Sequence, residues 1–216
     1  MNKEIQWIFF DVGMTLIDET NSYQDFVERC VVSLRQHDLA VCHEGFWQKM
    51  KEASCDFKNP LQTALNYYRG ELKLPRPIWQ VKNECLMPEV KVTLAKLQSS
   101  YHLGIIANQV QGLEGCLRKL GIADYFDLIL SSSDCAYHKP QPEIFQLALK
   151  QAQAKAENCV YVGDRCDNDI IPAKKLGFTT IRMLYGLAAL QAENPDFPSD
   201  FQITKLTQIM DVLMRK

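Results

Sequence analysis

The chain has 216 residues, of which 47% are hydrophobic and 23% are charged, and its formal net charge at pH 7 is −2. This near-neutral balance lacks the excess of Lys and Arg that is typical of proteins that grip nucleic acid through its phosphates. No run of about 18 apolar residues is present, which predicts no membrane-spanning helix. The N-terminal stretch also lacks the features of a cleaved secretion signal, so we expect an unprocessed cytoplasmic protein.

Short apolar runs separated by helical patterns predict an alternation of strands and helices. The first run, residues 5–10, is nearly continuous and ends abruptly at Asp11, which favours a strand covered on both faces. Runs of the same character follow at residues 103–107, 128–130, 160–162 and 179–183. Apolar residues at helical spacing occur at residues 113–120, 144–152 and 203–213. The alternation predicts a doubly wound α/β fold with a parallel sheet.

Residues 18–87 interrupt this alternation. They contain three apolar patterns at helical spacing and only two glycines. Ser22 followed by Asp25 fits the capping pattern of a helix N-terminus and predicts where the first of these helices starts. We therefore expect residues 1–17 and 88–216 to form an α/β core domain and residues 18–87 to form an inserted helical domain.

The eight cysteines show neither a C-x-x-C pair nor the spacing of a metal finger. We expect them to be reduced thiols that pack as small hydrophobic side chains. Cys166 stays open as an exception, because it lies in an acidic loop where its thiol would line a site.

Polar residues stand where predicted strands end or a predicted helix begins. They are Asp11, followed by Gly13 and Thr15, in FFDVGMTL; Asn108 in GIIANQ; Lys139 in HKPQPEIF; and Asp164 with Asp169 in VGDRCDND. The carboxyl ends of parallel strands meet at one edge of the sheet, and ligands bind at that edge in this fold class. We therefore expect these side chains to converge.

Three carboxylates and a lysine at one edge favour a metal-assisted phosphate chemistry. Carboxylates held close together repel one another, and a hard divalent cation such as Mg²⁺ compensates them while bridging to a phosphate. Lys139 would neutralise both the phosphate and an attacking carboxylate. Asp11 is the candidate nucleophile, because the turn after it leaves backbone amides for phosphoryl oxygens, and its attack would form an aspartyl phosphate.

The motifs resemble those of the haloacid dehalogenase (HAD) superfamily of hydrolases, in the subfamily with a helical C1-type cap inserted after the first motif. FFDVGMTL is similar to motif I, GIIAN to motif II, KPQPEIF to motif III and VGDRCDND to motif IV, so the resemblance covers essentially the whole chain. It implies a HAD-like, Rossmann-type core with a cap domain. It also implies a Mg²⁺-dependent phosphohydrolase that acts on a small phosphorylated metabolite through an aspartyl phosphate.

The resemblance implies a role for each matching residue. Asp11 would be the nucleophile and, like Asp164 and Asp169, a Mg²⁺ ligand. Gly13 would bind Mg²⁺ through its backbone carbonyl, and Lys139 would be the charge clamp in catalysis. The phosphate or substrate would be bound by Gly13, Met14, Thr15, Asn108 and Lys139.

Two positions depart from the phosphatases of this family. Gly13 stands where they carry a second Asp that acts as general acid and base, and Ala107 stands where they carry a Ser or Thr hydroxyl for the phosphate. A positioned general acid or base contributes roughly 10²- to 10⁴-fold to a rate. We therefore expect slow turnover, or turnover mainly of leaving groups that need no proton. Water, or an insertion residue such as Glu19, His43 or Lys51, would replace the missing acid.

Three alternatives stay open. A catalytically degenerate protein would bind a phosphorylated ligand or a partner without turnover. A haloacid dehalogenase also lacks the second acid, but the dehalogenases of this family work without Mg²⁺, whereas Asp164 and Asp169 are both present here. A phosphonatase would need a cap lysine such as Lys51 to form a Schiff base, and GIIAN does not resemble the second motif of that subgroup.

Overall fold

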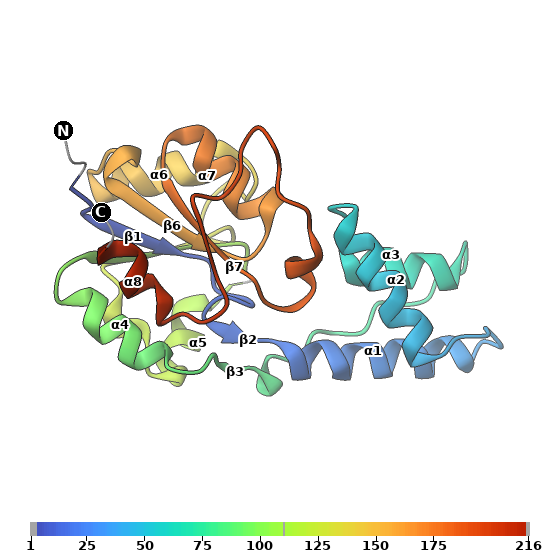
Figure 1. The fold of residues 1–216 in the computed structure, drawn as a ribbon. Helices are drawn as coiled ribbons and strands as arrows, with labels where there is room; N and C mark the ends of the chain where they lie inside the picture. Colours follow the sequence, from blue (N-terminus) through green and yellow to red (C-terminus); the bar gives the residue numbers. More distant parts are fainter. Residues whose placement is uncertain (1–3, 110, 215–216) are drawn as a thin grey trace. The chain divides into compact units, whose positions relative to one another are not determined.

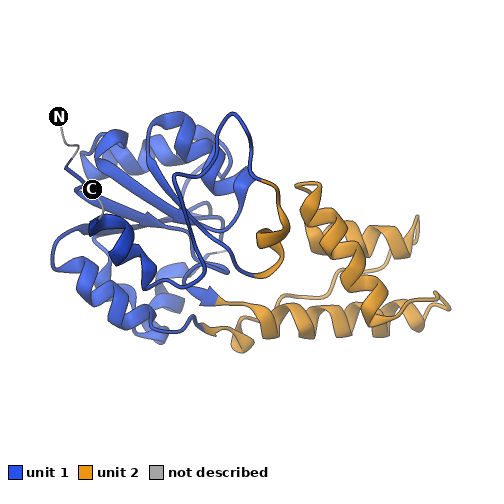
Figure 2. Cartoon of the chain, in the orientation of Figure 1, with its two compact units in different colours: residues 1–17, 86–185, 193–216 blue, residues 18–85, 186–192 orange. Residues whose placement is uncertain are grey.

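The computed structural model describes residues 4–109 and 111–214 (Figure 1). The chain divides into two compact units (Figure 2). Unit 1 consists of Met1–Ile17, Leu86–Tyr185 and Glu193–Lys216, and unit 2 consists of Asp18–Cys85 and Gly186–Ala192. Within the described ranges, no helix is both long enough and apolar enough to cross a membrane.

Unit 1 is built on a six-stranded parallel sheet. In spatial order its strands are β5 (Leu128–Ser131), β4 (His102–Ala107), β1 (Trp7–Phe10), β6 (Cys159–Gly163), β7 (Thr179–Met183) and β8 (Phe201–Ile203). Each predicted strand is present, and β8 is an additional edge strand. The predicted doubly wound α/β fold is confirmed.

Helices cover both faces of this sheet (Figure 1). One face packs against α4 (Val90–Gln98), α5 (Leu113–Leu120) and α8 (Gln208–Met214), and the other against α6 (Pro142–Ala152) and α7 (Ile171–Leu176). Alternate residues of β1 point to opposite faces. Ile8 and Phe10 join the first hydrophobic cluster, whereas Trp7 and Phe9 join the second. A strand buried on both sides explains why its sequence is continuously apolar.

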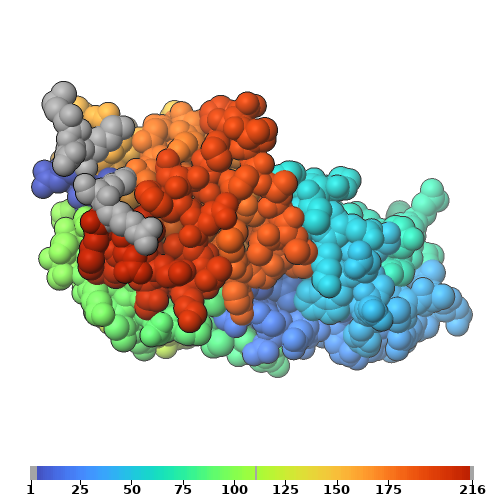
Figure 3. Space-filling model, viewed as in Figure 1, coloured from blue at the N-terminus to red at the C-terminus, as the bar shows by residue number. Residues whose placement is uncertain are grey.

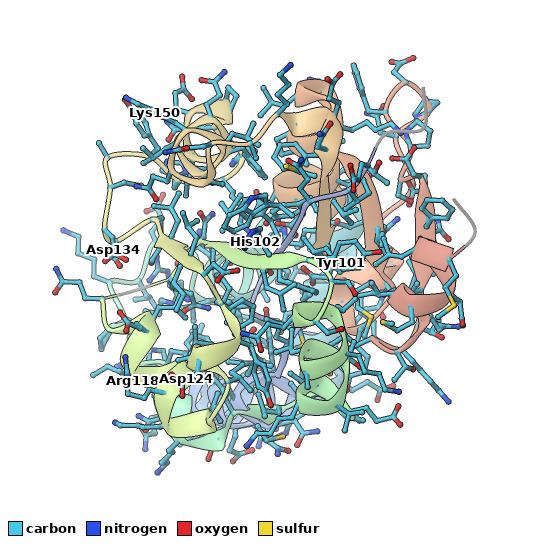
Figure 4. All side chains as sticks on the ribbon, turned by 90° about the vertical axis from the view of Figure 1, so that its left-hand side faces the viewer. Tyr101, His102, Arg118, Asp124, Asp134 and Lys150 are labelled. Atoms are coloured by element: carbon cyan, nitrogen blue, oxygen red, sulfur yellow. The ribbon has the colours of Figure 1, made fainter. Side chains whose placement is uncertain are left out.

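Many charged residues of the helices and connecting segments of unit 1 lie on its surface. Figure 4 labels four exposed examples, Arg118, Asp124, Asp134 and Lys150. In Figure 3 the atoms of β8 and α8, drawn in red, form part of the surface of this unit. The central strands of the sheet, β1, β4 and β6, contain no Asp, Glu, Lys or Arg.

Unit 2 is helical. Its helices are α1 (Thr20–Arg35), α2 (His43–Cys55), α3 (Pro60–Arg69) and the short 3-10 helices η1 (Val81–Asn83) and η5 (Gly186–Leu190). The apolar faces of α1, α2 and α3 meet in one cluster, in which Phe26, Phe46 and Met50 are fully buried. The start of α3 is set locally, because the Asn59 side chain accepts a hydrogen bond from the amide of Gln62 over 2.9 Å.

The structure differs from the predicted division of the chain in two places. Leu86 and Met87 lie in unit 1, and residues 186–192 belong to unit 2. This last segment contains the 3-10 helix η5 (Gly186–Leu190) and packs on α2, where the hydroxyl of Ser54 donates to the carbonyl of Leu187 over 2.7 Å. The two partners are 133 residues apart, so no local pattern predicts their contact.

The chain passes between the two units where β2 (Ile17–Asp18) and β3 (Cys85–Leu86) pair as a two-stranded sheet. Sequence periodicity does not predict such short strands, because two residues contain no pattern. Residues 1–3, 110 and 215–216, which the prediction assigned to the core domain, lie outside the described residues.

Two local predictions were wrong. Ser22 lies inside α1, which starts at Thr20, and its buried hydroxyl donates to the carbonyl of Gln80 over 2.9 Å instead of capping the helix. At the other end of the chain, Ile203 ends β8, and the last helix begins only at Gln208. Ladder pairing with β7 overrides the helical spacing of this segment.

Candidate active site

Unit 1 brings three of the predicted acids together at the carboxyl ends of its central strands. Asp11 follows β1 and Asp164 follows β6, the neighbouring strand. Asp169 lies in the short π-helix η4 (Cys166–Ile170) that comes next. One carboxylate oxygen of each residue lies within 4.8 Å of the other two.

Lys139 reaches this cluster from the segment before α6. Its Nζ atom lies 2.6 Å from Asp11 Oδ1 and 2.6 Å from Asp169 Oδ1. Only 3% of the lysine side chain is exposed, so both ion pairs form away from water. An ammonium group has three hydrogens to donate. The third goes to the hydroxyl of Tyr161, 3.0 Å away, a residue to which sequence analysis assigned no role.

Asn108 holds the backbone of Lys139. Its Oδ1 accepts from the Lys139 amide over 2.7 Å, and its Nδ2 donates to the Lys139 carbonyl over 2.8 Å. These paired bonds connect the end of β4 to the lysine segment. Among the described residues the second hydrogen of Nδ2 has no partner, so it is available for the phosphate contact that the sequence predicts.

Gly163, the last residue of β6, makes room for Asp169. A Cβ atom added at Gly163 would lie 2.6 Å from both Cβ and Cγ of Asp169. Any other residue would therefore displace this carboxylate, whose Oδ2 also accepts from the Arg165 amide over 3.0 Å. Gly163 stands in the VGD string of the sequence, but its close approach to Asp169 is recognised only in the structure.

The loop after Asp11 folds back on itself. Met14 adopts a left-handed backbone with φ of 55°, and its amide donates to the carbonyl of Ile17 over 2.7 Å. The Thr15 amide lies 3.4 Å from the carbonyl of Val12. A phosphate oxygen bound to either amide would have to replace these bonds. The Thr15 side chain is fully buried, and its hydroxyl has no hydrogen-bond partner in the described part of the chain.

Burial and mutual repulsion raise the pKa values of Asp11 and Asp164. Burial raises the pKa of Asp11 to about 6, and Asp169 adds to the rise while Lys139 opposes it. Burial also raises the pKa of Asp164 well above its usual range, with Asp169 and Asp11 contributing. For Lys139, burial lowers the pKa, but the two neighbouring carboxylates outweigh it and hold the pKa well above its ordinary value. The ammonium therefore stays charged.

The donor set fits a hard divalent cation. Three carboxylates face one lysine, so negative charge remains in excess when all of them are ionised. Mg²⁺ prefers oxygen ligands and usually binds through a few carboxylates together with water and substrate phosphate. A bound cation would favour the ionised forms of the same acids whose pKa burial raises.

Cys166 is a buried thiol. Its side chain is buried at the start of η4, and burial raises the pKa of the thiol to about 12. The thiolate is the nucleophilic form of cysteine, and the raised pKa disfavours this form near neutral pH. The structure gives it the role of a small buried side chain.

The family model for haloacid dehalogenase-like hydrolases matches residues 8–183. The chain belongs to this family. A glyceraldehyde 3-phosphate phosphatase from Pyrococcus furiosus is 28% identical to it, with 99% of this chain and 95% of the relative covered. A phosphoglycolate phosphatase from Photorhabdus laumondii is 34% identical, with 90% and 88% covered. These findings confirm the haloacid dehalogenase-like resemblance of the four motifs.

A solved structure agrees in fold. The crystal structure of a HAD phosphatase from Thermococcus onnurineus has a TM-score of 0.69 and 21% sequence identity, and covers 97% of this chain and 98% of that one. The haloacid dehalogenase-like chain is thus similar to these proteins over nearly its whole length. Its departures from the family's motifs are local, at Gly13 and Ala107.

Proposed function

We propose that this chain is a Mg²⁺-dependent phosphatase that acts on a small phosphorylated metabolite. One observation carries the proposal. The carboxylates of Asp11, Asp164 and Asp169 lie within 4.8 Å of one another, and the Lys139 ammonium lies 2.6 Å from two of them. The names of the relatives, glyceraldehyde 3-phosphate phosphatase and phosphoglycolate phosphatase, support a small phosphate ester as the substrate.

Asp11, Asp164 and Asp169, with the backbone carbonyl of Gly13, would hold the Mg²⁺ ion. The bound ion would supply positive charge to the phosphate and to the crowded carboxylates. A carboxylate oxygen of Asp11 attacks phosphorus, the bond from phosphorus to the leaving oxygen breaks, and an aspartyl phosphate forms. Water then attacks the same phosphorus, the bond between phosphorus and the Asp11 oxygen breaks, and the Asp11 carboxylate is restored while inorganic phosphate leaves with the protons of that water.

Lys139 would reduce the repulsion between the nucleophile and the phosphate, because its ammonium already contacts Asp11. Gly13, Met14, Thr15 and Asn108 remain the proposed phosphate contacts. Two donors support this assignment, the second hydrogen on Asn108 Nδ2 and the hydroxyl of Thr15, which has no partner among the described residues.

No side chain at position 13 protonates the leaving group. The ammonium of Lys139, which contacts Asp11, is already bonded to Asp169 and Tyr161. A leaving group that departs as a stable anion is therefore favoured. We expect p-nitrophenyl phosphate to turn over faster than an alkyl phosphate.

The test measures release of phosphate from p-nitrophenyl phosphate and from a panel that includes glyceraldehyde 3-phosphate and phosphoglycolate, in Mg²⁺ or in EDTA. The proposal expects turnover that disappears in EDTA and in Asp11→Asn. Asp124→Asn, which removes an exposed acid outside the cluster, is the matched control and should keep the natural rate.

A binding protein without turnover is the second candidate, because Gly13 and Ala107 replace two catalytic groups. In that case the natural protein and Asp11→Asn would be equally inert on the whole panel, while calorimetry would still detect binding of Mg²⁺ and inorganic phosphate. Release of chloride from 2-chloropropionate without Mg²⁺ would instead support the dehalogenase alternative.

A further inference from the structure

Tyr161 is a fully buried side chain of β6 whose hydroxyl reaches the catalytic cluster. Its ring packs edge-on against Phe145, with centroids 5.2 Å apart, and against Phe178, with centroids 6.3 Å apart. These contacts belong to the hydrophobic cluster on the face of the sheet that α6 and α7 cover. The ring is therefore held by packing, and the hydroxyl has a defined position at its end.

The hydroxyl of Tyr161 lies among three polar groups. Its oxygen is 2.9 Å from the carbonyl of Ile106, 3.0 Å from Lys139 Nζ and 3.2 Å from Asp169 Oδ1. A tyrosine hydroxyl donates one hydrogen and accepts through its lone pairs. The carbonyl of Ile106, near the end of β4, is the closer acceptor and takes the hydrogen. The oxygen then accepts a hydrogen bond from the Lys139 ammonium.

We propose that Tyr161 is a positioning residue that fixes the ammonium of Lys139 between Asp11 and Asp169. With the two carboxylates alone, Nζ is free to swing about the line that joins their oxygens, because the lysine stem is flexible. A third bond, to a hydroxyl anchored in the packed sheet, removes that freedom. The kinetic consequence of this inference rests on the proposed phosphatase function.

A purely structural role for Tyr161 makes a different prediction. In that case the hydroxyl only satisfies a buried carbonyl, and its loss lowers stability without changing the chemistry of the folded protein. Thr180→Val provides a matched control. Thr180 is also fully buried in the sheet, in β7, and its hydroxyl is bonded to Asp200 over 3.1 Å near the amino end of the strand, away from the catalytic edge.

The first experiment compares Tyr161→Phe, Thr180→Val and the natural protein on p-nitrophenyl phosphate and in denaturant unfolding. We expect kcat of Tyr161→Phe to fall by about 10- to 100-fold, the range that a small misplacement of a catalytic group produces. KM should stay within about twofold, and Thr180→Val should keep the natural kcat. A kcat of Tyr161→Phe within about twofold of the natural value would overturn the inference.

The second experiment determines the position of the Lys139 ammonium by crystallography. In crystal structures of the natural protein and Tyr161→Phe, we expect Nζ of the variant to move by about 1 Å or to occupy two conformers. An unmoved Nζ overturns the inference. If the natural protein turns over no phosphate ester but Nζ moves, the proposed function fails and the positioning role stands. If Tyr161→Phe does not fold, p-fluorophenylalanine at position 161 fills the space of the hydroxyl and serves both experiments.

Discussion

The two units bury different kinds of polar side chains. Among the described residues, those buried in unit 2 are uncharged, namely Ser22, Ser54 and Gln191. Unit 1 buries four charged residues, Lys139, Asp164, Asp169 and Arg182. Burying a charge costs far more free energy than burying a hydroxyl. Unit 2 is thus stabilised by apolar packing, whereas unit 1 also holds a charged cluster that is costly to bury and whose geometry suits catalysis.

Arg182 shows that a buried charge also supports the site indirectly. Its guanidinium pairs with Glu193 over 2.8 Å, and its Nε donates to the backbone carbonyl of Asp164 over 3.3 Å. Glu193 in turn accepts from the amide and hydroxyl of Ser199. This network connects β7 and the segment before β8 to the loop that carries Asp164.

The largest effect should come from restoring the missing acid in unit 1. Gly13→Asp places a carboxyl group two residues after Asp11, and in its protonated form this group would donate its proton to the leaving oxygen. We expect turnover of glycerol phosphate to rise by roughly 10²- to 10⁴-fold, with a much smaller rise for p-nitrophenyl phosphate, whose leaving group needs no proton. Steady-state rates on both substrates check this. An equal rise on both would contradict the role assigned to position 13.

A large change in unit 2 should leave metal binding intact. Phe46→Ala removes a fully buried ring from the unit 2 cluster and should lower the free energy of unfolding by about 3–5 kcal/mol. All proposed carboxylate ligands lie in unit 1, so the affinity for Mg²⁺ should stay within about twofold at a temperature where the variant is folded. Denaturant unfolding and calorimetry measure the two quantities. A much weaker affinity for Mg²⁺ would show that the metal site depends on the packing of unit 2.

A single added methyl group in unit 1 should lower activity rather than stability. Gly163→Ala would force Asp169 away, and we expect kcat to fall by about 100-fold, because a misplacement of about 1 Å is enough for such a loss. Gly115→Ala is the control, since a Cβ at Gly115 has no neighbour within 4 Å. The control should keep its activity and gain slightly in stability, because it lies inside α5. Equal activity of the two variants would contradict the proposed role of Asp169.

The smallest effect concerns pH in the absence of metal. The pKa of Asp11 rises from 3.8 to about 6 on folding, so between these values the folded protein binds more protons than the unfolded chain. Stability should therefore fall as pH rises through this window. Comparison with Asp11→Asn cancels other groups such as Glu193, whose pKa is lowered and whose slope is opposite. Urea unfolding in EDTA from pH 4 to 7 should show the natural protein losing stability relative to the variant, and a relative gain would contradict this.

The ends of the strands were predictable because strands that are buried on both faces have continuous apolar sequences. Asp11 and Asp164 each follow such a run, and parallel strands share an edge, so the pattern of the chain was enough to predict that they meet. Lys139 and Asp169 carried weaker local signals. They were included because a predicted helix begins just after Lys139 and near Asp169, and the resemblance to the family then implied their roles. The structure places both at the same edge.

Tyr161, Gly163 and the segment 186–192 could not be assigned in this way. Tyr161 is one more strand residue in CVYVG, and nothing along the chain indicates which groups its hydroxyl meets. The need for glycine at position 163 arises only because the side chain of Asp169 packs against it. Residues 186–192 were predicted to be part of the core domain, but they pack on α2 of unit 2.

Patterns in the sequence were enough to predict the alternating α/β core, the helical insertion and the charged residues at the sheet edge, because each depends on spacing within a short stretch of chain. The folded protein was needed to see how the ammonium of Lys139 is held, which glycine leaves space for a carboxylate and which segment joins unit 2. Each of these depends on contacts between side chains and backbone groups from different elements, and such contacts form only when the strands have paired and the helices have packed.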